Sequence, residues 1–485
     1  MGEPEPGREH MAERTKYKEG AQVRNFEDMR KLASEALKGA DADYCEFRFE
    51  DSRETVIQFQ GAALENVKKA NLYGGNVRAL HNGGWGFASF NSIDELDRNV
   101  KLACSQARAA GKAVGGKSRL AEAPVVVDDY RPEFGMHPES VSLSEKLEVL
   151  GKYHKLALSY DNIPSANIQY QERATTLFFA NTEGSAIRQE KLDFAMSVSA
   201  QARKGDVSVA QAVGEGSSLG IDKLYGLEGR IREMCERAQQ LLDAPSIKAG
   251  VYTVVCDPTH AGLFVHEAFG HLSEADDLSK RPDFLKQMYL GRVLGKPFLN
   301  IYDTGDIMTS RGGMKYDDEG VECRRAELVK GGKLVGRLNS RWSAAELGEP
   351  VTGSARALSY VFPPIVRMRN TCIGPGESTF EDLIKDVKLG LYAVGSGGGQ
   401  TNGEMFNFAA FYGVMIRDGK LAELVRDVKL SGNVFTTLEN IDMVAGDQSP
   451  RNGAGGCGKG PQSPLPTSGD CPHIRIRNVV VGGVK

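Results

Sequence analysis

The segment VHEAFGHL, residues 265–272, contains two histidines and a glutamate within eight residues. In the H-E-x-x-H pattern of zinc-binding helices, two histidines lie one helical turn apart and a general base follows the first. His266 and Glu267 fit that pattern, but His271 comes one residue too late. Positions i and i+5 of a regular α-helix lie roughly 140° apart around the axis, so the two imidazoles would point to different faces.

Two local geometries would bring His266 and His271 to one ion. A π-bulge would add one residue to the turn and restore the one-turn relation between them. Alternatively, the helix would end at Gly270, which leaves helical backbone angles at low cost. Asp257 and Pro258 predict where the helix begins, as N-cap and first helical residue. The competing interpretation is a helix with two core histidines and no metal.

A third ligand would decide between these interpretations, because a catalytic zinc ion needs three protein ligands and an open position. The candidates near the motif are Cys256, His260, Glu274, Asp276 and Asp277, and the distant ones are Cys457, Cys471 and His473. We expect the three carboxylates to form a solvated acidic loop, and His260 to lie on the wrong side of the helix. Cys457 lies in NGAGGCGKGPQ, where glycines allow close backbone approach and N–H groups can support a thiolate.

The segment around Cys457 also matches part of a phosphate-binding loop, G-x-x-x-x-G-K, at 453–459. The next residue, Gly460, has no hydroxyl group for magnesium. Three prolines follow and prevent the helix that such a loop requires. We therefore reject a nucleotide-binding interpretation.

Length and composition indicate a globular protein of two domains, with three as the alternative, because 485 residues exceed one ordinary core. A formal net charge of −4 gives no indication of nucleic-acid binding, and no apolar run is long enough for a membrane span. Eight dispersed cysteines and no apolar signal segment predict a cytoplasmic location with reduced thiols. The expected parts are a disordered tail at 1–24, an N-terminal α/β domain at 25–245 and a β-rich C-terminal domain at 246–485.

Local patterns predict an α+β fold, with a mixed sheet flanked by helices in the first domain and the VHEAFGHL helix in the second. YCEFRFED at 44–51 alternates apolar and charged residues, which is typical of a half-buried strand. Capping-box pairs Ser92/Glu95 and Ser142/Glu145 predict two helix starts. Further helices are expected at 26–39 and 226–244, strands between about 165 and 215, and hairpins at 327–338 and 412–424.

Several segments of the chain occur together in one known family: HEAFGH at 266–271, YDDEG at 316–320, TGSARALSY at 352–360, RMRNT at 367–371, GGGQTNGEMFNF at 397–408, GGCGKG at 455–460 and ANTEGS at 180–185. By these segments the chain resembles the TldD/PmbA family, once called modulators of DNA gyrase, from about residue 25 to the end. HEAFGH and GGCGKG resemble the TldD-like branch, whereas the TldE/PmbA-like branch lacks the metal motif.

This resemblance implies a zinc metallopeptidase in which His266, His271 and Cys457 bind Zn²⁺ and Glu267 is the catalytic base. Two neutral imidazoles and a thiolate leave zinc with the same formal charge as a His₂Glu site, so water would be acidified in the same way. Cys471 and His473 are not part of the family pattern, and a disulfide or competing site built from Cys471 is the alternative.

The family also implies cleavage of unfolded or short peptides inside a dimer cavity. The dimer would be either a homodimer or a heterodimer with a TldE/PmbA-like subunit. The rival functions are a non-catalytic zinc-binding regulatory subunit and a hydrolase that acts on another kind of amide. Arg367, Asn370 and Lys459 are candidates for stabilising an oxyanion, with structural or surface roles as the alternative.

Overall fold

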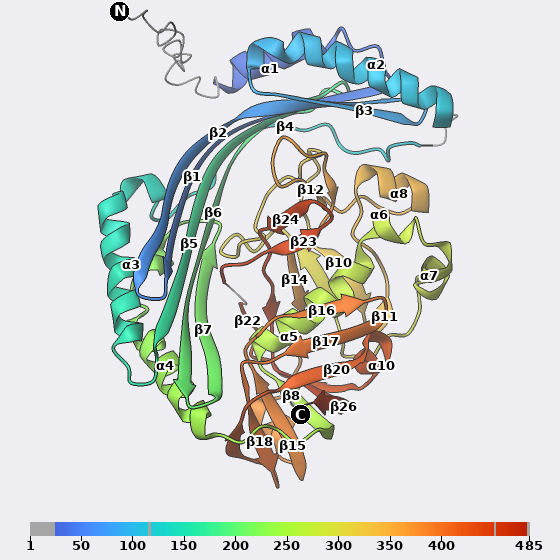
Figure 1. Cartoon of the computed structure of the whole chain (residues 1–485). Coiled ribbons are helices and arrows are strands. Elements are labelled where there is room, and N and C mark those ends of the chain that lie inside the picture. Colours follow the sequence, from blue (N-terminus) through green and yellow to red (C-terminus); the bar gives the residue numbers. More distant parts are fainter. Residues whose placement is uncertain (1–24, 115–117, 451–452, 483–485) are drawn as a thin grey trace, which may run out of the picture.

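The computed structural model describes residues 25–114, 118–450 and 453–482. The predicted disordered tail at 1–24 lies outside these residues. Figure 1 shows the long strands of the N-terminal half curving around one side of the C-terminal half. Among the described residues, no helix has both the length and the apolar character needed to cross a membrane.

The N-terminal half contains a seven-stranded sheet in the order β3-β2-β1-β5-β6-β4, with β7 paired to β6. Its strands are β1 (Tyr44–Gln60), β2 (Ala63–His81), β3 (Gly84–Phe90), β4 (Val127–Tyr130), β5 (Ser165–Asn181), β6 (Ala186–Lys204) and β7 (Val207–Ser217). The β4–β6 pair is parallel and the other pairs are antiparallel, so the sheet is mixed as predicted.

Two pairs of helices cover the convex face of this sheet (Figure 1). They are α1 (Phe26–Leu37) with α2 (Leu96–Val114), and α3 (Leu143–Leu158) with α4 (Glu228–Asp243); short 3₁₀ turns are η1 (Ile93–Glu95), η2 (Pro138–Ser140) and η3 (Asp222–Leu224). Ser142 caps α3 by accepting the backbone N–H of Glu145, which confirms that helix start. At Ser92 the prediction was imprecise, because η1 comes first and the hydroxyl oxygen accepts from the N–H of Asp94.

The C-terminal half is rich in β-structure and confirms the predicted fold class. A nine-stranded sheet has the order β16-β17-β20-β26-β8-β15-β18-β19, with β21 paired to β26, and a four-stranded sheet has the order β11-β10-β9-β14. The strands are β8 (Gly250–Cys256), β9 (Ile301–Thr304), β10 (Ala326–Lys330), β11 (Lys333–Leu334), β12 (Ala355–Arg356), β13 (Ile365–Val366), β14 (Asn370–Ile373), β15 (Leu389–Val394), β16 (Gly399–Asn402), β17 (Met405–Ala409), β18 (Tyr412–Arg417), β19 (Lys420–Val425), β20 (Lys429–Asn433), β21 (Ile441–Val444), β22 (Ser449–Pro450), β23 (Cys457–Lys459), β24 (Gln462–Leu465), β25 (Asp470–Cys471) and β26 (Ile474–Gly482).

The helical segments of this half are short. They are α5 (Pro258–Phe264), η4 (Val265–Gly270), η5 (His271–Ser273), α6 (Ala275–Leu278), α7 (Pro282–Gln287), α8 (Arg341–Leu347), α9 (Phe380–Ile384) and α10 (Val434–Glu439). Both predicted hairpins are confirmed, as β10–β11 and β18–β19. In the second, Asp418 and Gly419 have φ of +46° and +77°, as a two-residue hairpin turn requires.

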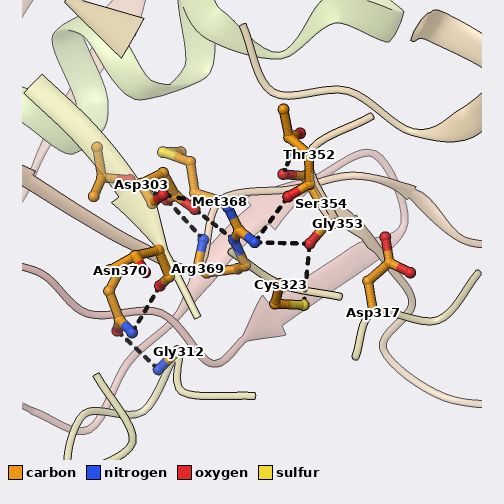
Figure 2. A network of polar contacts seen from close by, with 12 residues as sticks. Asp303, Gly312, Asp317, Cys323, Thr352, Gly353, Ser354, Met368, Arg369 and Asn370 are labelled. Atoms are coloured by element: carbon orange, nitrogen blue, oxygen red, sulfur yellow. Dashed lines mark hydrogen bonds and ion pairs between the residues drawn. The ribbon is translucent and has the colours of Figure 1, made fainter. Parts of the chain in front are cut away.

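A buried polar network fixes the interior of the C-terminal half (Figure 2). The Arg369 guanidinium donates to Asp303 at 2.7 Å, and neither side chain is exposed to solvent. Arg369 also donates to the carbonyl oxygens of Thr352 and Gly353, both at 3.0 Å. These bonds satisfy a fully buried charge and join strands β9 and β14 to the loop at 352–354.

The two halves meet through the concave face of the N-terminal sheet. On β1, Phe47 and Phe49 pack under the helices, whereas Arg48 and Glu50 face the C-terminal half. Arg48 is 1% exposed and lies 3.6 Å from the carboxylate of Asp318. The expectation that one face of this strand meets solvent is therefore wrong, because a second layer covers its charged side.

Candidate metal centre and cavity

The helix that carries the VHEAFGHL segment begins where the sequence predicts. Asp257 is its N-cap, with Oδ1 accepting the backbone N–H of His260 at 2.7 Å, and Pro258 is the first helical residue. After one stretch of α-helix, η4 is a π-helical turn, and His271 donates its backbone N–H to the carbonyl oxygen of His266. The π-turn absorbs the extra residue between the histidines, so the first of the two proposed geometries is confirmed.

The alternative geometry, a break at Gly270, is wrong. Gly270 has φ −56° and ψ −49°, and the helical path continues through His271 to Ser273. The glycine is needed for packing instead, since a Cβ atom at this position would lie 2.1 Å from the sulfur of Met368.

His266, His271 and Cys457 converge on one point. One ligand atom of each lies within 4.8 Å of the others, and no other such group of three occurs among the described residues. Cys457 Sγ is 3.3 Å from His271 Nε2, although 186 positions separate the two residues. Two nitrogens and a sulfur around tetrahedral zinc lie roughly 3.5 Å apart, so the donors and their spacing fit this ion.

The hydrogen-bond partners of His271 favour its protonated form. Burial acts to lower the pKa of His271, but hydrogen bonds to Cys457 and Glu274 outweigh it and raise the pKa to about 11. The Nδ1 atom lies 3.1 Å from Glu274 Oε2, which leaves Nε2 directed at the thiol. A metal ion bound through Nε2 would compete with this proton, because a ligand imidazole is neutral.

The carboxylates that follow the motif are not a solvated loop, which corrects the expectation from sequence. Glu274 is 1% and Asp276 is 7% exposed, while Asp277 is partly exposed. The ammonium group of Lys459 lies within 3.3 Å of all three carboxylates. Glu274 could have been identified by its spacing, since a residue three positions after a helical ligand lies on the same face.

Glu267 is half-buried between two cavities. The larger, about 980 Å³, is lined by His266, Glu267, parts of β7 and α4, and the glycine-rich loops at 395–398 and 453–456. The smaller, about 490 Å³, is lined by Glu267, His271, Lys459 and strand β16. Since Glu267 lines both cavities, space for a ligand extends to either side of it.

The N-terminal half contributes to this site, which the sequence did not reveal. Arg311 donates to both carboxylate oxygens of Asp193 on β6, at 2.7 and 2.8 Å. The same guanidinium donates to the carbonyl oxygens of Gly453 and Gly455, just before Cys457. Arg311 thus ties the loop that leads to the third ligand to the N-terminal sheet.

Two candidates for oxyanion stabilisation lie away from the cavities. Arg367 is 0% exposed and donates to the backbone carbonyl oxygens of Cys457 and Gln462. Asn370 is also 0% exposed and belongs to the network of Figure 2, where it accepts the N–H of Gly312. Both side chains are therefore structural, whereas Lys459 lines the smaller cavity.

The other ligand candidates are not part of the convergent group. His260 is buried, with Nδ1 2.9 Å from the carbonyl oxygen of Gly395. His473 is held by Asp447 and Tyr392, at 2.7 and 3.0 Å. Cys256 and Cys471 are buried, and neither forms a disulfide within the described part of the chain.

Three family models match successive parts of the chain. Residues 45–110 match domain 1 of the PmbA/TldA metallopeptidases, residues 137–242 match the central domain, and residues 249–483 match the C-terminal domain. The two-domain division proposed from sequence stays a prediction.

Whole-chain relatives carry related names. A metalloprotease of Synechocystis sp. is 42% identical over 92% of this chain and 96% of its own length. A zinc metalloprotease TldD homologue of Saccharolobus solfataricus is 29% identical over 84% of this chain and 90% of its own.

Solved structures share the fold at lower identity. A protein from Thermotoga maritima, named as a modulator of DNA gyrase, superposes with a TM-score of 0.75 and 20% identity over 95% of this chain and 100% of its own. TldE of Thermococcus kodakarensis gives a TM-score of 0.73 and 18% identity over 94% of this chain and 99% of its own.

The three matched models define the class as metallopeptidases, and the solved structures share its fold. The chain belongs to the PmbA/TldD family, because the three family models together match most of its length and a metalloprotease relative is 42% identical over 92% of it.

Proposed function

We propose that the chain is a zinc-dependent peptidase that hydrolyses peptide bonds of unfolded or short peptides. The observation that carries this proposal is the convergence of His266, His271 and Cys457 beside Glu267, at the junction of two cavities. The name of a relative as a zinc metalloprotease supports the choice of metal.

His266, His271 and Cys457 would hold Zn²⁺, because two imidazoles and a thiolate are preferred zinc donors. When bound there, zinc supplies Lewis-acid chemistry that acidifies water and polarises a carbonyl group. Glu267 follows His266 directly and faces the cavity junction, where its carboxylate accepts the proton of the attacking water and passes it to the leaving amine.

Strand β16 is the proposed main-chain binding surface for the peptide. It is an outer strand of the nine-stranded sheet, and its residues line the smaller cavity beside Glu267. An extended peptide can add to a sheet edge through main-chain hydrogen bonds, which gives broad sequence tolerance. Cavities on both sides of Glu267 suit a chain that continues past the cleaved bond in both directions.

We further propose that the site works inside a dimer, formed with a second copy or with a TldE/PmbA-like subunit. Such an enclosure would admit flexible peptides and exclude folded proteins. Cytoplasmic location and the absence of nucleic-acid and membrane partners stay predictions from composition.

The test compares wild type with Glu267→Gln on an unstructured peptide, after zinc has been quantified in both proteins. We expect equal zinc content and a loss of cleavage in the variant, because glutamine cannot accept the proton. Equal cleavage by both proteins would overturn the role of Glu267. Zinc without any cleavage by wild type, alone or with a TldE/PmbA-like partner, would instead favour a non-catalytic subunit.

A further inference from the structure

Glu274 and Lys459 lie behind the proposed zinc ligands, and neither is accounted for by the chemistry above. We propose that they form a clamp that positions His271 and Cys457 for the metal before it binds. This inference rests on the proposed zinc site. It makes Glu274 and Lys459 positioning residues, which act through the ligands.

Glu274 is placed to orient the imidazole of His271. Its Oε2 atom lies 3.1 Å from Nδ1, and its side chain is 1% exposed. A hydrogen bond to Nδ1 fixes the ring plane and leaves Nε2 as the ligand atom, which here faces Cys457 at 3.3 Å. A carboxylate behind a ligand histidine also increases the electron-donating strength of the imidazole.

Lys459 connects Glu274 to the other ligand-bearing segment. It belongs to the same strand β23 as Cys457, and its Nζ atom is 3.2 Å from Glu274 Oε2. The same ammonium donates to Asp276 Oδ1 at 2.7 Å and to the carbonyl oxygen of Val366 at 3.0 Å. One partly buried cation therefore joins the segment after His271 to the hairpin of Cys457.

The three carboxylates are not a second cation site, since the ammonium group of Lys459 already lies among them. Nor is the cluster a general surface feature, because Glu274 and Asp276 are buried. Of the three acids, Glu274 contacts a proposed ligand, whereas Asp276 and Asp277 pair with Lys459. That difference supplies a matched control, because the carboxylate of Asp276 accepts from the same lysine and from the backbone N–H of Val366 rather than from His271.

The experiment measures zinc dissociation constants by competition with a chromophoric chelator, for full-length wild type, Glu274→Gln, Glu274→Ala and Asp276→Asn. We expect Glu274→Ala to weaken zinc binding about 10–100-fold, as loss of a supporting residue does, and Glu274→Gln to weaken it less. Asp276→Asn should stay within about twofold of wild type, because His271 keeps its partner.

A second readout uses Co²⁺ in place of zinc. Thiolate–cobalt absorption should shift in Glu274→Ala and stay unchanged in Asp276→Asn, because only the first alters the orientation of His271. The double variant Lys459→Met/Glu274→Gln should lose less zinc-binding free energy than the sum of the losses in the two single variants, because both changes disrupt the same clamp.

Wild-type zinc affinity in Glu274→Ala would overturn the clamp, and so would equal losses in Glu274→Ala and Asp276→Asn. If Glu274→Ala fails to fold, Glu274→Gln decides by the same criterion. These outcomes leave the role of Glu267 intact, whereas failure of wild type to bind zinc would overturn the proposed function itself.

Discussion

At the scale of single residues, Cys457 is the residue that favours a metal site over the competing interpretation, a helix with two core histidines. Two imidazoles in contact are compatible with an ordinary core, but a thiol 3.3 Å from His271 Nε2 gives the trio a donor set that suits zinc. Two arginines hold the Cys457 segment in position, because Arg367 and Arg311 both donate to backbone carbonyl oxygens of that segment.

Replacing Cys457 by alanine should remove one of three proposed ligands. We expect zinc binding to weaken by more than the roughly 10–100-fold loss that follows removal of a supporting residue. Cys471→Ala is the matched control, because Cys471 is also a buried thiol but lies outside the convergent group. Zinc titration of both variants checks the prediction, and full zinc occupancy in Cys457→Ala would refute it.

Ligand types could be predicted from sequence, but their environment could not. His266, Glu267 and His271 are local in the chain, so their pattern was visible. The burial of Glu274 depends on Lys459, 185 positions later, and an acidic run with no known partner is typical of a solvated loop. The spacing of Glu274 from His271 was visible in the sequence, but its burial and its pairing with Lys459 left no local pattern.

At the scale of elements, the π-turn at η4 brings the two histidines of the motif to one point. Two helix geometries were compatible with the sequence, and no local residue chooses between them. In the structure Gly270 packs against Met368, which is far away in the chain. Helix caps and hairpin turns were predictable because their determinants lie within a few residues. The order of strands in the nine-stranded sheet was not, because it joins segments across the whole C-terminal half.

Gly270→Ala should disturb the turn that holds His271. The added Cβ would lie 2.1 Å from Met368 Sδ, and overpacking of this kind costs about 1–3 kcal/mol. Gly151→Ala is the control, because Gly151 lies within helix α3 and a Cβ there meets nothing within 4 Å. That change should stabilise the protein slightly, by about 0.5–1 kcal/mol.

Denaturant unfolding and zinc titration check the pair. Gly270→Ala should lower both stability and zinc affinity, whereas Gly151→Ala should lower neither. A Gly270→Ala protein with wild-type stability would show that the contact with Met368 does not constrain the turn.

At the scale of the whole molecule, the concave face of the N-terminal sheet and the YDDEG segment form a buried charged interface. Asp318 lies 3.2 Å from Lys191 and 3.6 Å from Arg48, both on strands of the N-terminal sheet. The carboxylate of Glu319 lies 2.6 Å from the guanidinium of Arg78 in the same sheet. The charged face of the strand and the acidic motif were both visible in the sequence, but the pairing between them could be seen only in the folded structure.

Asp318→Asn should destabilise the protein in a pH-dependent way. Burial acts to raise the pKa of Asp318, but the charges of Lys191 and Arg48 outweigh it and hold the pKa below its usual value. A lowered carboxyl pKa adds stability above the unfolded value of about 3.9, and this stability is lost as the pH falls through the folded value. Breaking a buried ion pair costs about 3–5 kcal/mol at neutral pH.

Thermal unfolding from pH 7 to pH 3 checks this prediction. The difference between wild type and Asp318→Asn should be largest at pH 7 and should shrink at the acid end. Glu322→Gln is the control, because Glu322 pairs with Arg324 at the exposed surface and its loss should cost less than about 1 kcal/mol at any pH. A pH-independent difference for Asp318→Asn would contradict the electrostatic account of the interface.

The central claim is that His266, His271 and Cys457 hold zinc beside Glu267. X-ray absorption at the zinc edge of the loaded wild-type protein tests it most directly. The account predicts one sulfur neighbour at roughly 2.3 Å and two imidazole nitrogens at roughly 2.0–2.1 Å. A first shell of nitrogen and oxygen alone, or one with two or more sulfurs, would contradict it.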